Sequence, residues 1–60
     1  MTNEQNEMIN LKWQQMPADN RPTFEEFKSS AAPTIGMNGA VVLNWCGMWL
    51  VIETDGHAHS

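Results

Sequence analysis

The sequence has few of the residues that small domains use to reinforce a core. Cys46 is the only cysteine among 60 residues, so no disulfide can form within the chain. A structural zinc ion takes about four ligands, and Cys46 with His57 and His59 does not supply them. A chain of this length buries only about 60% of the surface that it exposes when unfolded. We therefore expect a homo-oligomer, in which a second copy supplies the missing burial.

Positive charge is also scarce. Lys12, Arg21 and Lys28 are the only basic side chains against seven carboxylates, which gives a formal charge of −4. Binding to DNA or RNA needs clustered Lys and Arg that neutralise phosphates. We therefore expect no nucleic-acid partner, and an acidic surface that suits solubility or docking on a basic patch of another protein.

A membrane segment is not expected, although residues 34–52 carry no charge and approach the length of a spanning helix. The run contains two asparagines and three glycines, and no Lys or Arg anchors its flanks. A single-span membrane peptide is therefore the less favoured alternative. The first fifteen residues lack the basic start and apolar centre of a secretory signal. With a lone thiol, this predicts the cytoplasm, or the host cytoplasm if a phage encodes the chain.

Two helices are expected in the first half of the chain. Thr2 and Gln5 have the spacing of a capping box, which predicts a helix over residues 2–16. The apolar side chains Ile9, Trp13 and Met16 would share one stripe of that helix. Pro17 ends it and begins a connector over residues 17–22.

The second helix is expected to begin after Thr23, which pairs with Glu26 as a second capping box. It would present Phe24 and Phe27 to a core and end at Pro33. Both helices are too short to be stable alone, so they must pack on another element.

The second half of the chain carries two hairpin signals. Asn38-Gly39 is typical of a type I′ turn, in which both residues have positive φ, and would pair Thr34–Met37 with the chain from Ala40 onward. A turn at Cys46-Gly47 would fold Val41–Trp45 onto Met48–Thr54.

This register places Val41, Leu43, Trp45, Met48, Leu50 and Ile52 on one side of the sheet. The opposite face would carry Ile35, Met37, Val42, Asn44, Trp49, Val51 and Glu53. Two short helices can cover one face of a small sheet, so the apolar residues of the second face indicate a further buried surface.

The predicted fold class is α+β, with two short N-terminal helices packed on an antiparallel β-hairpin or meander of two to three strands. We expect one domain over residues 1–60, with a helical part at 1–33, a β part at 34–56 and a flexible tail at 57–60. The oligomer would form through the outer sheet face or the exposed edge of the last strand.

Catalysis is not expected. Cys46 with His57 or His59 could be drawn as a thiol–imidazole pair, but a small chain offers little scaffold for the oxyanion site that such a pair needs. His57 and His59 resemble half of a metal site without further ligands nearby. We therefore predict no catalytic residue, no metal and no cofactor.

The candidate binding residues are aromatic or polar. Trp49 and its cross-strand neighbour Asn44 would form a flat indole beside an amide, which suits an interface more than a ligand site. Trp13 and Trp45 point toward the expected core. Arg21 is the only arginine and could hold a phosphate or carboxylate with its planar fork.

These observations favour a small non-enzymatic binding protein that acts by occupancy. Size and acidity are typical of phage or mobile-element inhibitors, which is an argument from analogy. The protein would either sequester a small nucleotide-like molecule between protomers or block a host defence protein. The alternative is a structural subunit or assembly factor of a larger complex.

The thiol generates the first testable prediction. Replacing Cys46 with Ser should leave function intact, because a chain of 60 residues offers little scaffold for the positioned base and the oxyanion site that a reactive thiol needs. Binding of whatever the protein recognises would be compared between the two forms. A folded Cys46→Ser variant that loses function would contradict this prediction and indicate thiol chemistry.

Overall fold

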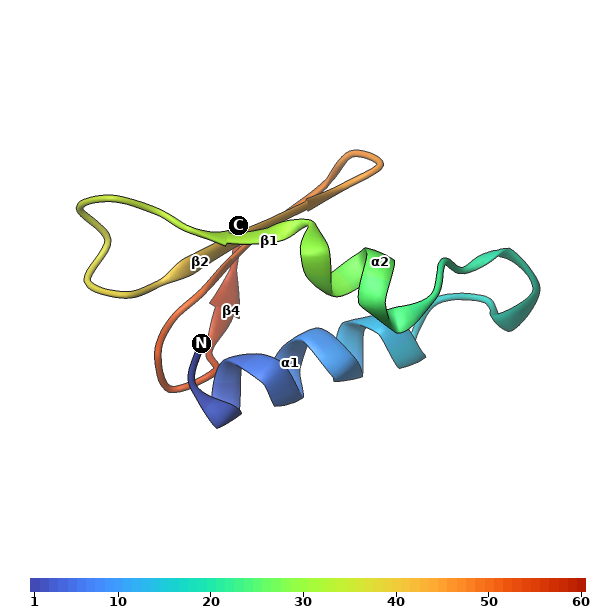
Figure 1. Cartoon of the computed structure of the whole chain (residues 1–60), viewed down its shortest axis with the longest axis horizontal. Helices are drawn as coiled ribbons and strands as arrows, with labels where there is room; N and C mark the ends of the chain where they lie inside the picture. Colours follow the sequence, from blue (N-terminus) through green and yellow to red (C-terminus); the bar gives the residue numbers. More distant parts are fainter.

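A computed structural model describes all 60 residues and shows helices on one side of an antiparallel sheet. The helical part contains α1 (Asn3–Gln14), a short 3-10 helix η1 (Ala18–Asn20) and α2 (Phe24–Ser29). The strands are β1 (Ala31–Pro33), β2 (Val41–Trp45), β3 (Met48–Ile52) and β4 (Ala58–His59), in the order β1-β2-β3-β4 (Figure 1). The predicted α+β class is confirmed, but the sheet has four strands rather than two to three.

Helix α1 begins as the capping box predicts. The hydroxyl of Thr2 accepts a hydrogen bond from the Gln5 backbone N–H at 3.1 Å, and the Gln5 side-chain oxygen accepts one from the Thr2 N–H at 2.8 Å. The helix ends at Gln14, before the predicted limit of Met16, because Pro17 disfavours helical geometry in the residue before it. It has 12 residues and is the long helix of the fold. Neither helix combines the length and apolar character that crossing a membrane requires.

Helix α2 is shorter than expected. Thr23 caps its start by accepting from the Glu26 N–H at 3.2 Å. At its end the Ser29 and Ser30 hydroxyls donate to the carbonyls of Glu26 and Phe27 at 2.7 and 2.6 Å, which gives partners to groups that a continuing helix would have bonded. The helix therefore stops at Ser29 instead of reaching Pro33.

The first strand lies earlier than predicted. It is β1, Ala31–Pro33, which pairs with Val41–Leu43, and the expected strand Thr34–Met37 is wrong. Pro33 favours extended geometry in the preceding residue, whereas Gly36 adopts φ +84° and turns the chain. Asn38 and Gly39 have φ of +52° and +87°, as the type I′ prediction requires, but they end a longer loop.

The central hairpin has the predicted register. Val41 pairs with Ile52, Leu43 with Leu50 and Trp45 with Met48. Cys46 and Gly47 form its two-residue turn with φ of +46° and +87°. The predicted inner face is confirmed: Val41, Leu43 and Ile52 are buried, and the other three side chains pack against them.

Strand β4 occupies the place of the predicted flexible tail. After a turn at Glu53–Gly56, Ala58 pairs with Ile52 and His59 with Val51. The His59 ring nitrogen lies 2.7 Å from a Glu53 carboxylate oxygen. Residues 57–60 show no alternation of apolar and polar side chains, so the sequence did not predict this strand. Backbone pairing with β3 and the contact between His59 and Glu53 stabilise it.

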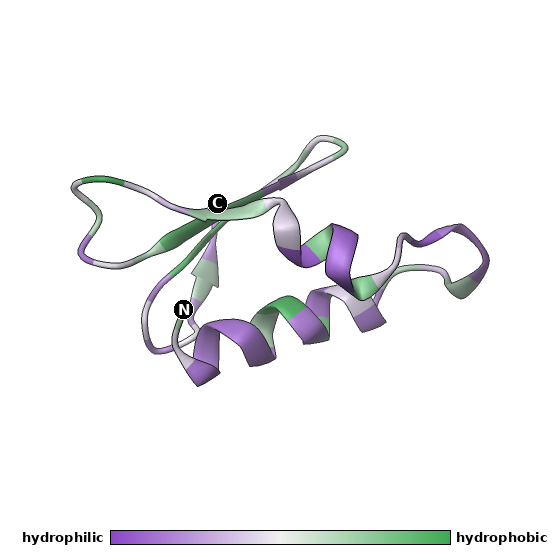
Figure 2. Cartoon of the chain, in the orientation of Figure 1, coloured by the Kyte–Doolittle hydropathy of each residue, from purple (hydrophilic) through white to green (hydrophobic).

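The core lies between α1, α2 and the inner face of the sheet. It is formed by the buried residues Ile9, Phe27, Val41, Leu43 and Ile52. In Figure 2 the hydrophobic colour concentrates on the strands, whereas most of α1 is hydrophilic. A small apolar stripe therefore attaches α1, and a polar contact supplements it.

That contact is made by Gln5, which is only 1% exposed. Its side-chain amide donates to the carbonyl of Gly39 at 3.0 Å and to that of Ile52 at 3.1 Å. Because its oxygen also accepts from Thr2, one side chain joins the helix start, the β1–β2 loop and the end of β3.

Gln5 generates a stability prediction. Gln5→Leu should lower the free energy of unfolding by about 2 kcal/mol or more, because it removes three hydrogen bonds, one of them to the carbonyl of Ile52 in a buried position. Gln14→Leu, at an exposed site on the same helix, is the matched control and should change it by about 0.5 kcal/mol or less. Urea unfolding of both variants provides the measurement, and equal midpoints would contradict the role given to Gln5.

Candidate functional site

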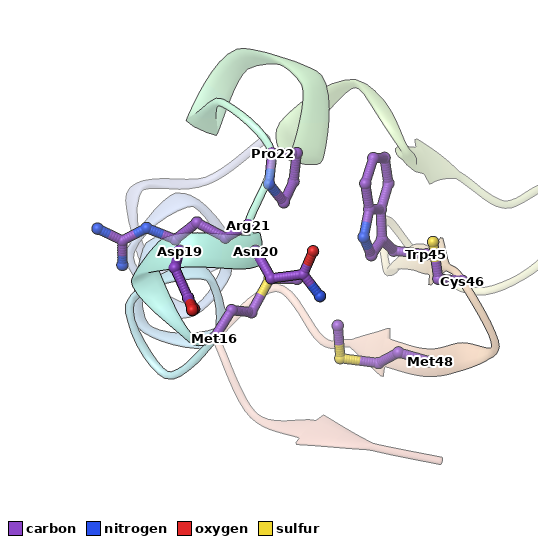
Figure 3. A pocket seen from close by; sticks show the side chains of 8 residues that line it. All are labelled: Met16, Asp19, Asn20, Arg21, Pro22, Trp45, Cys46 and Met48. Carbon is purple, nitrogen blue, oxygen red and sulfur yellow. The ribbon is translucent and has the colours of Figure 1, made fainter.

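The larger of two cavities lies between the connector after α1 and the turn of the central hairpin. It is a cleft open to solvent, with a volume of about 630 Å³. It is lined by Met16, Asp19, Asn20, Arg21 and Pro22 on the connector side and by Trp45, Cys46 and Met48 on the hairpin side (Figure 3). The cavity therefore joins two segments that are far apart in the sequence.

Trp13 holds the connector in place. Its indole N–H donates to the Pro22 carbonyl at 2.8 Å, and its ring meets that of Phe24 edge to face at 5.7 Å. The guanidinium carbon of Arg21 lies 4.0 Å from the centre of the same indole, a cation–π geometry. One side chain of α1 thus fixes both the end of the connector and the start of α2.

The hairpin side is held by Trp45. Its ring meets Phe27 of α2 edge to face, with centroids 6.0 Å apart and planes at 70°. Trp45 also pairs across the strands with Met48, directly beside the tight turn at Cys46-Gly47. Both walls of the cavity are therefore attached to α2 through aromatic contacts, and its shape exists without a ligand.

The polar groups in the cavity differ in direction. Figure 3 shows the Asn20 amide pointing toward Trp45 and Met48, while the Arg21 guanidinium is turned away from the Trp45 indole. The N–H of Trp13 is bonded to Pro22, whereas that of Trp45 has no hydrogen-bond partner within the chain and is not enclosed. The cavity thus offers a free indole donor and an amide.

The five candidate residues fall into two groups. Trp13, Arg21 and Trp45 come together around the cavity, although only Arg21 and Trp45 line it. Asn44 and Trp49 pair on the opposite face of the sheet. The two groups therefore belong to separate surfaces.

The outer face is less apolar than the sequence indicates. Val51 is only 7% exposed, and Ile35 lies in the β1–β2 loop rather than on the sheet. What remains is Trp49, 54% exposed, beside the exposed amide of Asn44 and the half-buried Val42. This is a small apolar patch with one dominant side chain.

The groups considered for chemistry lie apart. Cys46 is in the hairpin turn before β3, and His57 and His59 lie beside the far end of that strand. Five extended residues span about 16 Å, so the thiol and the imidazoles do not meet. The two imidazole rings are 6.1 Å apart, and no three His, Cys, Asp or Glu side chains come together as a metal site.

Of the connector half of the cavity, sequence reasoning identified only Arg21. Asn20, Pro22 and Met16 line it, and no spacing in residues 16–22 indicates a binding site. The site depends on packing the connector against a turn about 25 residues later in the chain, which local periodicity does not report.

Comparisons with known proteins give no match to this chain, whether with family models, curated proteins or solved structures. Function is therefore argued from the residues themselves.

The geometry predicts different effects for two Trp→Phe changes. Trp13→Phe keeps a ring but removes the bond to the Pro22 carbonyl, so it should lower the free energy of unfolding by about 1 kcal/mol. Trp49→Phe is the control and should have a smaller effect, since the Trp49 indole N–H has no partner in the chain and the ring is exposed. Thermal unfolding followed by circular dichroism measures both, and an equal loss would contradict the role of Trp13.

Proposed function

We propose that the protein is a non-enzymatic binding protein that acts by occupancy and takes a small planar molecule into the cavity between connector and hairpin. The observation that carries the proposal is the free indole N–H of Trp45 in a cavity of about 630 Å³. Ligand sites in proteins are typically clefts of about 300–1,000 Å³ with mostly apolar walls and a few polar groups that fix orientation.

The construction of the walls supports this proposal. The aromatic pairs Trp13–Phe24 and Phe27–Trp45 attach the connector and the hairpin to adjacent turns of α2. A preformed site loses little conformational entropy when it binds, which raises affinity for a small ligand. Sequestration needs only such a site and no reactive group, and it agrees with an expected lack of catalysis.

A second candidate function rests on Trp49. This side chain is 54% exposed beside Asn44, on the face opposite the helices. Exposed tryptophans are over-represented among the residues that dominate protein interfaces. A protein partner on this face, either a second copy or a blocked target, is compatible with a ligand in the cavity because the two surfaces are separate.

Native mass spectrometry of the untagged protein, purified gently from cells, tests both functions together. We expect a constant excess mass per chain for the wild type and for Trp49→Ala, and its loss in Trp45→Ala. A folded Trp45→Ala variant, verified by circular dichroism, is required for the comparison. The Trp49→Ala variant should lose any oligomer that the wild type forms.

Two outcomes would contradict the preferred function. Excess mass that persists in Trp45→Ala but disappears in Trp49→Ala would move the ligand to the outer face. A wild-type protein that carries no added mass when purified from cells would remove the support for sequestration and leave the protein-binding candidate.

A further inference from the structure

None of the polar groups that point toward Trp45 and Met48 is a cation. The Trp45 indole N–H and the Asn20 amide point into the cavity, whereas the guanidinium of Arg21 is turned away in Figure 3. Asp19, the other charged lining residue, adds a carboxylate rather than a counter-charge for an anion. A phosphate beside Trp45 would therefore have no cation directed at it in this arrangement.

Arg21 is also engaged elsewhere. Its guanidinium carbon lies 4.0 Å from the centre of the Trp13 ring, and turning it toward a ligand would give up that contact. The chain carries a formal charge of −4, so its field opposes the approach of an anion. Arg21 thus packs on Trp13 and is not directed at a phosphate in the cavity, a role that the sequence had left open.

The remaining lining suits the faces and edge of a flat ring. Trp45, Pro22 and the thioethers of Met16 and Met48 offer apolar and polarisable surface, which packs well on aromatic rings. An indole donates one hydrogen bond, and an amide both donates and accepts. Together they fit a ring edge that alternates acceptors and donors, as nucleobase edges do.

From this geometry we propose that the cavity recognises a neutral heteroaromatic ring of the nucleobase type through its edge and faces, and makes no use of a phosphate. The inference rests on the proposed function, because it specifies what the same cavity binds. It replaces a nucleotide-like ligand with a base or nucleoside whose acceptor atom receives the Trp45 N–H.

Nuclear magnetic resonance of the ¹⁵N-labelled protein tests this ligand class, because each of the three tryptophans gives a separate indole N–H signal. The probes are adenosine, cytidine, adenosine 5′-monophosphate and indole, which has a flat ring without an acceptor. The Trp45 signal is assigned from its absence in Trp45→Phe. This variant keeps a ring against Phe27, and its fold is checked by the remaining signals.

We expect a nucleoside to shift the Trp45 signal saturably and to leave the Trp13 and Trp49 signals in place. The monophosphate should bind no more tightly than adenosine. Trp45→Phe should weaken nucleoside binding about tenfold, the usual effect of one lost hydrogen bond, with affinity then read from backbone signals of residues 16–22. Trp49→Phe, on the opposite face, should change the affinity less than twofold.

Three results would overturn the inference. A monophosphate that binds tenfold more tightly than adenosine would reveal a phosphate subsite, and indole that binds as tightly as the nucleosides would exclude recognition of the ring edge. Failure of every probe to move the Trp45 signal would reject the nucleobase class. None of these results decides the proposed function, which is tested separately by native mass spectrometry. That test asks whether the purified protein carries an excess mass that Trp45→Ala removes.

Discussion

The side chain of Gln5 is the contact on which the arrangement of this small domain depends. It is buried to 1% exposure and bonds to the carbonyls of Gly39 and Ile52, so it ties the start of α1 to one end of the sheet. Two neighbouring contacts reinforce that end: Thr2 donates to the Thr54 carbonyl at 2.7 Å, and Gly56 packs so closely that a Cβ would lie 2.9 Å from the Glu4 carbonyl oxygen. With few buried apolar residues available, a satisfied polar link fixes the direction of α1.

Once the start of α1 is fixed, its far end determines where the cavity forms. Trp13 lies one residue before the end of α1 and binds the connector through Pro22 and Arg21. The connector is then held near the hairpin turn that Trp45 anchors on Phe27. The two indoles have different roles: the N–H of Trp13 is used for structure, and that of Trp45 remains available. The proposed binding function follows from this division.

The sequence predicted the features that depend on local chemistry. The Thr2–Gln5 cap, the positive φ of Cys46 and Gly47 and the pairing of Val41 with Ile52 follow from side-chain type and period-two alternation. The sequence did not predict the features that depend on tertiary contacts. The shift of β1 to Ala31–Pro33 follows from competing effects of Ser30, Pro33 and Gly36, and β4 has no apolar pattern. The sequence identified Trp45 and Arg21 of the candidate site. It did not identify Asn20 as a lining residue, or show that Trp49 lies on a different surface, because both depend on how the connector packs.

Hydrogen exchange of the three indole N–H groups in the ligand-free protein tests the central claim most directly, because it compares the tryptophans within one molecule. The account predicts that the Trp13 proton, bonded to the Pro22 carbonyl, exchanges slowly and that the Trp45 proton exchanges as fast as that of exposed Trp49. A slow Trp45 proton would mean that the chain already satisfies this donor. A fast Trp13 proton would mean that the connector is not held. Either result would contradict a preformed cavity with a free indole N–H.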